Sequence, residues 1–474
     1  MSSRSKFRAW TALVAAGLCA TCAVPSSASA QSSAVTPEQA AELGKQAYDY
    51  GFPLLEFLRV RREMTSVECP TDHGEAPVNS FSNAGGFADA SARTVVAPNT
   101  DTLYSISHLD LKRGPLVISH PDMGKRYYSF ELLDPFTNVI DIPGLREDGG
   151  KAGSYVIRWK GHAGKGGKPE GARVIKSKYR RVWVIGRTLA TDAKDQRKAQ
   201  KLMAKYEIDR LNGKPARKFP KGCEPGEPIT SPTPTDGPSF IAALNAGLAQ
   251  NPPPKRDDPL LGQLAPLGVG PGLSPESAGL SADALAALYK GVSDEAAALP
   301  GRSRLGVLSE AQRTQGWLLP AANIGDYGTD YEFRALIAVV GLGANTPDEA
   351  IYPTGITDGT GTLYNAANRY TLTFPPGQAP PAKYFWSLTM YDSSGYLVDN
   401  PIDRYSVGPS HPPLVKRPDG SIVIAIQATD PNDPTVNWLP TPASGGFRLS
   451  LRLYGPSKAA QTGAWRPPGV VQVP

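Results

Sequence analysis

Alternation of apolar and polar positions is densest between residues 93 and 134. Apolar runs in this stretch are separated by the turn sequences Pro-Asn, Lys-Arg-Gly-Pro and Pro-Asp-Met-Gly, so the pattern predicts four short strands. In the last strand, alternation places Tyr128 and Phe130 on one face and Tyr127 and Glu131 on the other. We therefore expect this stretch to form a sheet with one face in a core.

Helical spacing appears before and after these strands. Thr36 to Gln39 read as a helix start, with a capping threonine, a proline at the first helical position and a glutamine three residues after the cap. Gly51 and Pro53 predict a break, followed by a second helix over 54–64. Further helices are expected at 240–249, 259–267, 281–299 and 331–340.

Strand-like alternation returns in the last quarter of the chain. Strands are expected at 362–374, 384–391, 422–427 and 447–454, whereas 437–440 reads as a loop. Short turns and the lack of strand–helix–strand alternation favour separate antiparallel sandwiches. The fold class is thus mainly β with a helical insert: a β domain with leading helices over 31–190, a helical section over 191–350 and a β domain over 351–474.

The first thirty residues have the features of a secretory signal peptide. A basic segment precedes an apolar run of about fifteen residues and the small residues Ala28 to Ala30. The run is shorter than the roughly 20 residues that a membrane span needs. We expect cleavage near Ala30, a secreted or periplasmic protein and no membrane span.

Charge and cysteine content narrow the classes of partner. Without the three basic residues of that segment the formal charge falls from +6 to +3, which gives no indication of a nucleic-acid partner. Two cysteines remain, Cys69 and Cys223. In an exported chain they form one disulfide or stay as two separate thiols, and the sequence leaves both possibilities open.

Several separated motifs resemble known families. The stretches APNTDTLYSISHLDL, PDMGKRYYSFELLD and VIGRT (184–188) resemble domain of unknown function 1254. The stretches DGTGTLYNAANRYTLTFPPG, FWSLTMYDSSGYLVDN and LRLYGP (451–456) resemble domain of unknown function 1214. The resemblance implies two jelly-roll-like antiparallel β domains joined by a helical middle section, in an exported bacterial protein. Glu131 departs from the family pattern, which more often has a neutral polar residue there.

Established catalytic motifs are missing from the sequence. It contains no Gly-x-Ser-x-Gly elbow, no His-Glu-x-x-His and no dinucleotide fingerprint, so neither a metal site nor a cofactor is expected. The five histidines show no metal-binding spacing, although His108 and His120 flank adjacent strands and are able to meet across a turn. A Ser-His-Asp set stays open, since such sets form in space.

Carboxylates near the start of a strand are the main catalytic candidates. Asp101 is the candidate acid or base, and Tyr104 is the candidate proton donor or orienting group. Glu131 or, alternatively, Asp134 is the candidate second acid. Asn99 lies at the same turn and is a candidate substrate contact. The alternative is structural, because Asp and Asn at such turns often bond backbone N–H groups.

Arginine and aromatic residues supply the candidate binding groups. Arg187 ends an apolar strand and either grips a substrate anion or pairs with a buried carboxylate. Four aromatic residues, together with Tyr104, form either a stacking platform or part of a β core: Tyr128, Trp386, Tyr391 and Trp438.

Three classes of function follow from these residues. The first is a hydrolase or lyase acting on a small polar or saccharide-like substrate. The second is a non-catalytic protein of the cell envelope that binds glycan or another surface polymer. The third is a structural role in a homo-oligomer.

Overall fold

The first helix of the structure, a computed structural model, begins at the predicted cap but is longer than predicted. The structure describes residues 35–93, 97–161, 168–304, 313–319, 321–411 and 413–474, so the expected signal peptide lies outside the described residues. Helix α1 (Pro37–Met64) starts with the capping box of Thr36 and Gln39 and continues through Pro53 without a break. The predicted break was therefore wrong, whereas residues 54–64 are helical as predicted and continue α1. Buried residues continue on both sides of Pro53, and this packing outweighs the proline's missing hydrogen bond.

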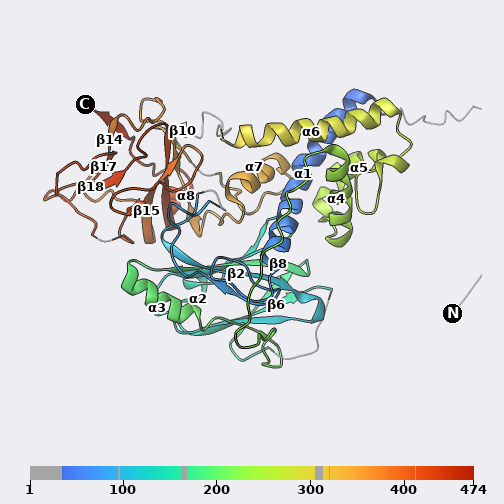
Figure 1. Cartoon of the computed structure of the whole chain (residues 1–474), viewed down its shortest axis with the longest axis horizontal. Coiled ribbons are helices and arrows are strands. Elements are labelled where there is room, and N and C mark those ends of the chain that lie inside the picture. The colour runs from blue at the N-terminus through green and yellow to red at the C-terminus, as the bar shows by residue number, and fades with distance from the viewer. Residues whose placement is uncertain (1–34, 94–96, 162–167, 305–312, 320, 412) are drawn as a thin grey trace, which may run out of the picture. The chain divides into compact units, whose positions relative to one another are not determined.

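Two sheets form a sandwich from the first half of the chain (Figure 1). The first sheet has the order β1-β2-β8-β4-β5, and all of its pairs are antiparallel. Its strands are β1 (Ser82–Asn83), β2 (Thr102–Asp110), β8 (Arg181–Leu189), β4 (Tyr128–Leu133) and β5 (Val139–Asp141). The second has the order β7-β6-β3-β9, with β7 (Arg173–Ser177), β6 (Gly153–Trp159), β3 (Leu116–His120) and β9 (Glu207–Arg210).

One hydrophobic core lies between these two sheets. Tyr128, Phe130 and Leu132 point into it, as the alternation of β4 predicted. Ile118 of β3 and Ile157 of β6 come from the opposite sheet. In this sandwich the expectation of purely antiparallel sheets was wrong at one pair, because β6 and β7 run parallel. The sequence between the two strands is long enough for the crossover connection that a parallel pair requires.

The helices of the middle section pack on α1. They are α4 (Gly237–Gln250), α5 (Asp258–Leu264), α6 (Ala282–Arg304) and α7 (Tyr331–Gly341), close to the predicted ranges. In Figure 1, α6 in yellow runs beside α1 in blue. Gly44 and Gly291 allow this close approach, since a Cβ at either position would overlap the backbone of the other helix. None of the helices in the described part of the chain has the length and apolar character that a bilayer crossing requires.

A second sandwich forms from the end of the chain. Its larger sheet has the order β10-β11-β13-β19-β15-β16, and β12 also pairs with β19. These strands are β10 (Arg313–Thr314), β11 (Trp317–Leu318), β12 (Ala350–Ile351), β13 (Thr354–Gly355), β15 (Ala382–Asp392), β16 (Ser406–Val407) and β19 (Phe447–Pro456). The smaller sheet, β18-β17-β14-β20, consists of β14 (Arg369–Phe374), β17 (Ile422–Gln427), β18 (Asn437–Pro440) and β20 (Val471–Val473). The loop predicted at 437–440 is thus a strand, which pairs in parallel with β17.

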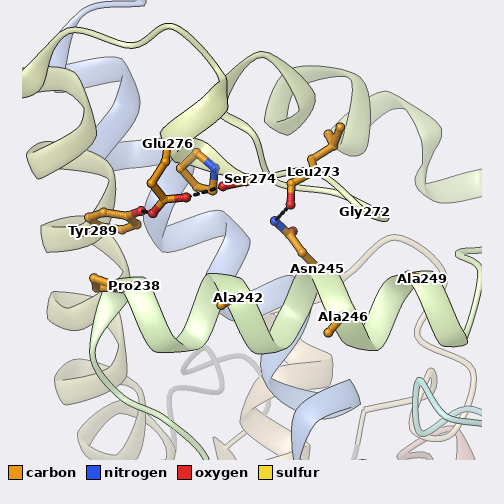
Figure 2. A pocket seen from close by; sticks show the side chains of 11 residues that line it. Pro238, Ala242, Asn245, Ala246, Ala249, Gly272, Leu273, Ser274, Glu276 and Tyr289 are labelled. Atoms are coloured by element: carbon orange, nitrogen blue, oxygen red, sulfur yellow. Dashed lines mark hydrogen bonds between the residues drawn. The ribbon is translucent and has the colours of Figure 1, made fainter.

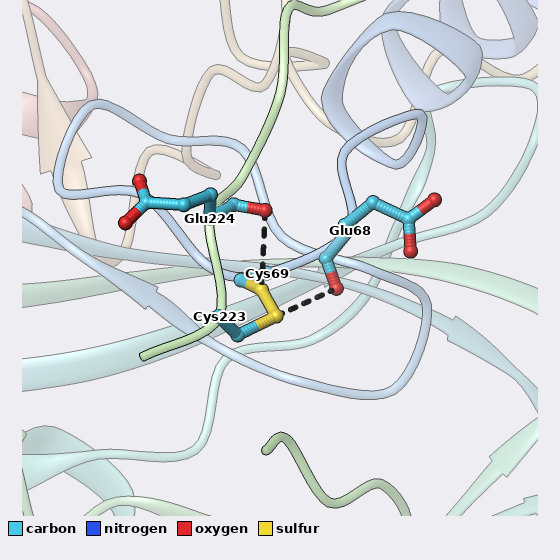
Figure 3. The surroundings of a disulfide bond; sticks show 4 residues. All are labelled: Glu68, Cys69, Cys223 and Glu224. Carbon is cyan, nitrogen blue, oxygen red and sulfur yellow. Dashed lines mark hydrogen bonds between the residues drawn. A yellow bond between two sulfur atoms is a disulfide. The ribbon is translucent and has the colours of Figure 1, made fainter. Parts of the chain in front are cut away.

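The two cysteines are paired. Cys69, in the loop after α1, forms a disulfide with Cys223, with the two Cα atoms 6.1 Å apart (Figure 3). Beside it, the N–H of Glu68 donates to the carbonyl of Pro225 at 2.8 Å. Of the two possibilities that the sequence left open, the structure has the disulfide.

Candidate functional site

The loop before β2 folds around Asn99. The Oδ1 atom of Asn99 accepts the N–H groups of Asp101 at 2.6 Å and Thr102 at 3.3 Å. Its Nδ2 donates to the Thr102 hydroxyl and to the hydroxyl of Tyr454 on β19, both at 2.8 Å. Asn99 therefore acts as the turn-forming residue that its sequence position also allowed, and it fixes the direction of Asp101.

Asp101 binds side chains of the C-terminal sandwich. It is fully buried, and its Oδ1 accepts hydrogen bonds from His411 Nε2 at 2.8 Å and from the Ser410 hydroxyl at 3.0 Å. Its Oδ2 accepts from the hydroxyl of Ser387 on β15 at 2.7 Å. Three donors thus surround one carboxylate, which is the condition for a buried charge to remain ionised.

A tight turn after β16 delivers His411 to this carboxylate. The His411 N–H donates to the carbonyl of Gly408 at 3.0 Å, and the turn passes directly against β15. A side chain at Gly408 would overlap the Trp386 carbonyl, so the approach requires glycine. The His411 side chain is 21% exposed, whereas Asp101 and Ser387 are 0% exposed. The imidazole is therefore the part of this group that reaches solvent.

Charges around Asp101 keep it ionised. Burial by itself raises the pKa of Asp101, but the hydrogen bond from His411, the charge of Arg452 and the hydrogen bond from Ser387 outweigh burial and lower it. Arg452 is held by the Thr389 hydroxyl at 2.7 Å, the Ala97 carbonyl at 3.0 Å and the Tyr391 hydroxyl. The guanidinium is itself buried and places a fixed positive charge beside the carboxylate.

A second polar group surrounds Arg187. Its Nη1 bonds Glu131 Oε2 at 2.6 Å and Asn345 Oδ1 at 3.1 Å, and its Nη2 bonds the Gly343 carbonyl at 3.1 Å. Both charged side chains are buried, and burial raises the pKa of Glu131 to about 7 although the charge of Arg187 opposes this. Arg187 therefore has a carboxylate partner within the fold, which is the structural alternative to gripping a substrate anion.

The ring of Tyr104 packs against the guanidinium of Arg187. It lies opposite Arg187 in the pairing of β2 with β8, and the Arg187 guanidinium lies 5.7 Å from the ring centroid. The side chain is half-buried, and within the described chain its hydroxyl makes no hydrogen bond. The structure thus brings Tyr104, Arg187 and Glu131 together, whereas Asp101 belongs to the hydrogen-bonded group of His411.

Two regions of the chain match known family models, and together they contain all of the Asp101 group. Residues 78–210 match the family described as protein of unknown function DUF1254, and residues 349–458 match the family described as protein of unknown function DUF1214. The order of the two regions agrees with the order that the sequence motifs predicted. The chain belongs to the DUF1254–DUF1214 family. In this family member, Asp101 comes from the DUF1254 region and His411, Ser387 and Arg452 come from the DUF1214 region.

A solved structure shows the same fold. The chain is similar to the VPA0106 protein from Vibrio parahaemolyticus, with a TM-score of 0.66 and 21% identity over 92% of this chain and 100% of that one. It also aligns with an uncharacterized protein from Burkholderia cenocepacia, with a TM-score of 0.43 and 13% identity over 92% and 93% of the two chains. No curated protein matches the chain significantly.

The aromatic candidates of this DUF1254–DUF1214 protein lie apart from one another. Trp386 is 5% exposed and packs on Phe374 in the C-terminal core, and Trp438 is 9% exposed and donates to the Gln427 carbonyl at 2.8 Å. Tyr128 is buried in the N-terminal core and donates to the Gly149 carbonyl at 2.9 Å. Only Tyr391, which contacts Arg452, borders the Asp101 group. The four rings therefore do not form one exposed platform.

The two histidines that were able to meet across a turn, His108 and His120, do not contact each other. His108 stacks on Trp183 at 5.4 Å, whereas His120 hydrogen-bonds the hydroxyls of Tyr128 and Tyr155. The two side chains thus occupy different surroundings on β2 and β3. Within the described residues, no group of three or more His, Cys, Asp or Glu side chains is arranged to hold a metal ion.

Two cavities of the family member lie in the helical section. One, of about 310 Å³, lies between α4 and the loop 272–276, where Glu276 accepts from Ser274 and Tyr289 (Figure 2). The other, of about 540 Å³, is lined mainly by charged residues of α1, α6 and α7. Neither cavity is lined by Asp101 or His411.

The sequence indicated Asp101 but not its partners. His411, Ser410, Ser387 and Arg452 carry no motif that links them to a carboxylate about three hundred residues earlier in the chain. The one available signal was a histidine beside a serine in the glycine- and proline-rich turn 408–413. Only the contact between the loop 97–102 and the strands β15, β16 and β19 assembles the group.

Proposed function

We propose that this DUF1254–DUF1214 protein is an exported hydrolase or lyase that acts on a small polar or saccharide-like substrate. The observation that carries this proposal is the hydrogen bond between the fully buried, ionised Asp101 and the partly exposed His411. A carboxylate that fixes an accessible imidazole is the orienting arrangement used in general acid–base catalysis.

In this proposal His411 is the general base and Asp101 is its positioning residue. The ionised Asp101 accepts the Nε2 proton, which leaves the Nδ1 lone pair of a neutral imidazole as the basic atom. Nδ1 has no hydrogen-bond partner among the described residues. It would take a proton from a water molecule in hydrolysis or from a carbon beside a carbonyl in elimination. Asp101 then stabilises the imidazolium that forms, while the hydroxyls of Ser387 and Ser410 hold the carboxylate in place.

Other residues have supporting roles. The unpaired, half-buried hydroxyl of Tyr104 is proposed as a proton donor or orienting group. Arg187 is paired with Glu131, so we assign it the placement of Tyr104 rather than the binding of a substrate anion. Because the His411 side chain is only 21% exposed, a small polar group is favoured as the reacting group.

Further proposals concern location, fold detail and assembly. The Cys69–Cys223 disulfide supports export to an oxidising compartment, in line with the signal peptide expected at residues 1–30. A jelly-roll-like path for each sandwich and a homo-oligomeric assembly also remain proposals. Glycan binding on Trp386 and Trp438 is not proposed, because both rings are buried.

Activity measurements on paired variants test the catalytic role. After a substrate has been found by screening esters, glycosides and small hydroxy acids, His411→Gln is expected to lower kcat by about 10² to 10⁴, the range for loss of a general base. Asp101→Asn should lower kcat in the same range, since it removes the acceptor that fixes the imidazole.

A matched control is His73→Gln, since the His73 side chain is 82% exposed and is not part of the Asp101 group. Circular dichroism and urea unfolding should show that the His411 variant is folded. Unchanged kcat in the folded His411→Gln variant would reject the catalytic assignment.

A further inference from the structure

Helix α3 (Ala193–Met203) presents a row of basic residues to solvent. We define the basic ridge as Lys194, Arg197, Lys198, Lys201 and Lys205, all of which are exposed. The first four follow the spacing i, i+3, i+4, i+7, which places them on one face of a helix. Lys205 continues the row one residue after the C-cap Ala204. With a rise of about 1.5 Å per residue, the ridge extends over roughly 16 Å.

The opposite face of α3 is fixed in the N-terminal sandwich. Ala199 and Met203 are fully buried in its core, and the amides of Gln196 and Gln200 both donate to the Gly85 carbonyl. These contacts prevent the helix from turning its basic face inward. The ridge is therefore a rigid feature of the surface.

The acidic residues of α3 are engaged elsewhere. Asp192 caps the helix by accepting the N–H of Asp195, and Asp195 forms a bidentate pair with Arg126 at 2.7 Å. No ridge residue forms a salt bridge with any residue that the structure describes. Five positive charges thus lie in one row, and among the described residues the nearest acid, Asp195, is paired with Arg126 while Lys198 contributes only a more distant attraction to it.

We propose that the basic ridge docks the protein on an anionic lipid surface. The chemistry of the ridge fits phosphate headgroups, because it offers charge at regular intervals without a cavity that would select one small anion. No aromatic residue lies in α3, so the stacking contacts that proteins use for single-stranded nucleic acid are missing from this face. Lipids diffuse laterally to meet fixed charges, and each lysine or arginine near such a surface strengthens binding several-fold.

Docking through the basic ridge would use none of the residues proposed for catalysis, although α3 begins near Asp101 in the fold. The helix begins just after β8, where the Ala190 N–H donates to the carbonyl of Asp101 at 3.3 Å. Tethering through α3 would thus hold the strand end beside Asp101 near the surface, without using any residue of the Asp101 group.

Vesicle sedimentation with the full chain tests the proposal. We expect binding to vesicles of phosphatidylcholine with about 30% phosphatidylglycerol, and no binding to phosphatidylcholine alone. Binding should weaken strongly when salt is raised from about 0.02 M to about 0.2 M, because the Debye length shortens.

Two triple variants with the same change of charge separate the ridge from net charge. K194Q/K198Q/K201Q should weaken binding by about a hundredfold, from the usual contribution of each cation. The control K112Q/K416Q/K458Q removes three exposed lysines from other elements and should bind like the unmodified protein.

The outcomes decide between specific explanations. Equal loss in both triple variants, or failure of the unmodified protein to bind anionic vesicles, would overturn the proposal. Ridge-dependent binding to duplex DNA or heparin with no binding to vesicles would overturn it in favour of a soluble polyanion. Thermal melting of both variants checks that the fold is intact.

Discussion

At the scale of single residues, the most unusual surroundings after Asp101 are those of Asp49 on α1. Asp49 shares Arg302 with Glu295 and Glu332, at 3.5 Å from Asp49 and 3.3 Å from Glu332. Burial and then the charge of Glu295 raise the pKa of Asp49 to about 7. Three carboxylates around one guanidinium leave an excess of negative charge between α1, α6 and α7.

The variant Asp49→Asn is expected to become more stable than the unmodified protein as pH rises above about 4. Because the pKa is raised on folding from 3.8 to about 7, the stabilising contribution of protonated Asp49 is complete below about pH 4 and is lost progressively between about pH 4 and pH 7. Asparagine resembles the protonated acid, so the variant should be more stable by about 1–3 kcal/mol at pH 8 and unchanged near pH 4. Urea unfolding across this range measures the difference.

The control for Asp49 is Asp399→Asn, an exposed acid in a loop of the C-terminal half. It should leave the pH dependence of the unfolding free energy as it is in the unmodified protein. If Asp49→Asn were destabilising at pH 8, the pairing of Asp49 with Arg302 would outweigh the repulsion among the carboxylates.

At the scale of elements, the crossing of α1 and α6 brings two helix backbones into direct contact. Gly44 faces the carbonyl of Leu288, and Gly291 faces the carbonyl of Ala41. A methyl group at either position must displace backbone, which is much stiffer than a side chain. The two glycines therefore determine how closely the helices approach.

Gly291→Ala is expected to destabilise the protein by about 1–3 kcal/mol, the usual effect of overpacking. Gly262→Ala on α5 is the matched control, because a Cβ there meets no atom within 4 Å. The control should be neutral or stabilising by up to about 1 kcal/mol through helix propensity. Chemical denaturation of both variants provides the comparison, and equal effects would show that the crossing tolerates more separation.

Hydrophobic periodicity predicted most helices and strands, and it failed where tertiary contacts determine the secondary structure. The alternation of β4 and the cap of α1 depend on neighbouring residues, so the sequence was sufficient for both. Pro53 lies within α1 because packing on both sides retains the helix. Strand β18 is short and rich in residues that also suit loops, and only its pairing with β17 makes it a strand. The parallel pairs depend on the return path of the chain, which no local pattern contains.

At the scale of the whole molecule, the disulfide connects segments that are 154 residues apart. Cys69 follows α1, and Cys223 lies in the long segment between β9 and α4. The bond therefore encloses most of the N-terminal sandwich in one covalent loop. A loop of this length restricts the unfolded chain more than it restricts the folded one.

The double variant Cys69→Ser/Cys223→Ser is expected to lose about 2–5 kcal/mol of unfolding free energy. The unmodified protein with a reducing agent should show the same loss, and the reducing agent should not affect the double variant further. Urea midpoints under the four conditions measure this. Identical midpoints with and without the bond would show that the long segment is held by other contacts.

Only the residues that the N-terminal sandwich contributes to the candidate site were predictable from the sequence. Asn99, Asp101 and Tyr104 were recognisable because ionisable residues at a strand start are uncommon unless they are bound or used. His411 was not, since its contact with Asp101 depends on how a turn of one sandwich meets a loop of the other. Arg187 and Glu131 were both identified from strand position, but their pairing with each other depends on the register of β4 and β8.

The hydrogen bond from His411 to Asp101 bridges 310 positions of the chain. Neither fragment released by a cut in the middle section would contain both partners. A protease acting between the two regions would therefore abolish the dyad unless the fragments stayed associated. Any gene that encoded one region alone would require its counterpart from a separate polypeptide before the proposed chemistry became available.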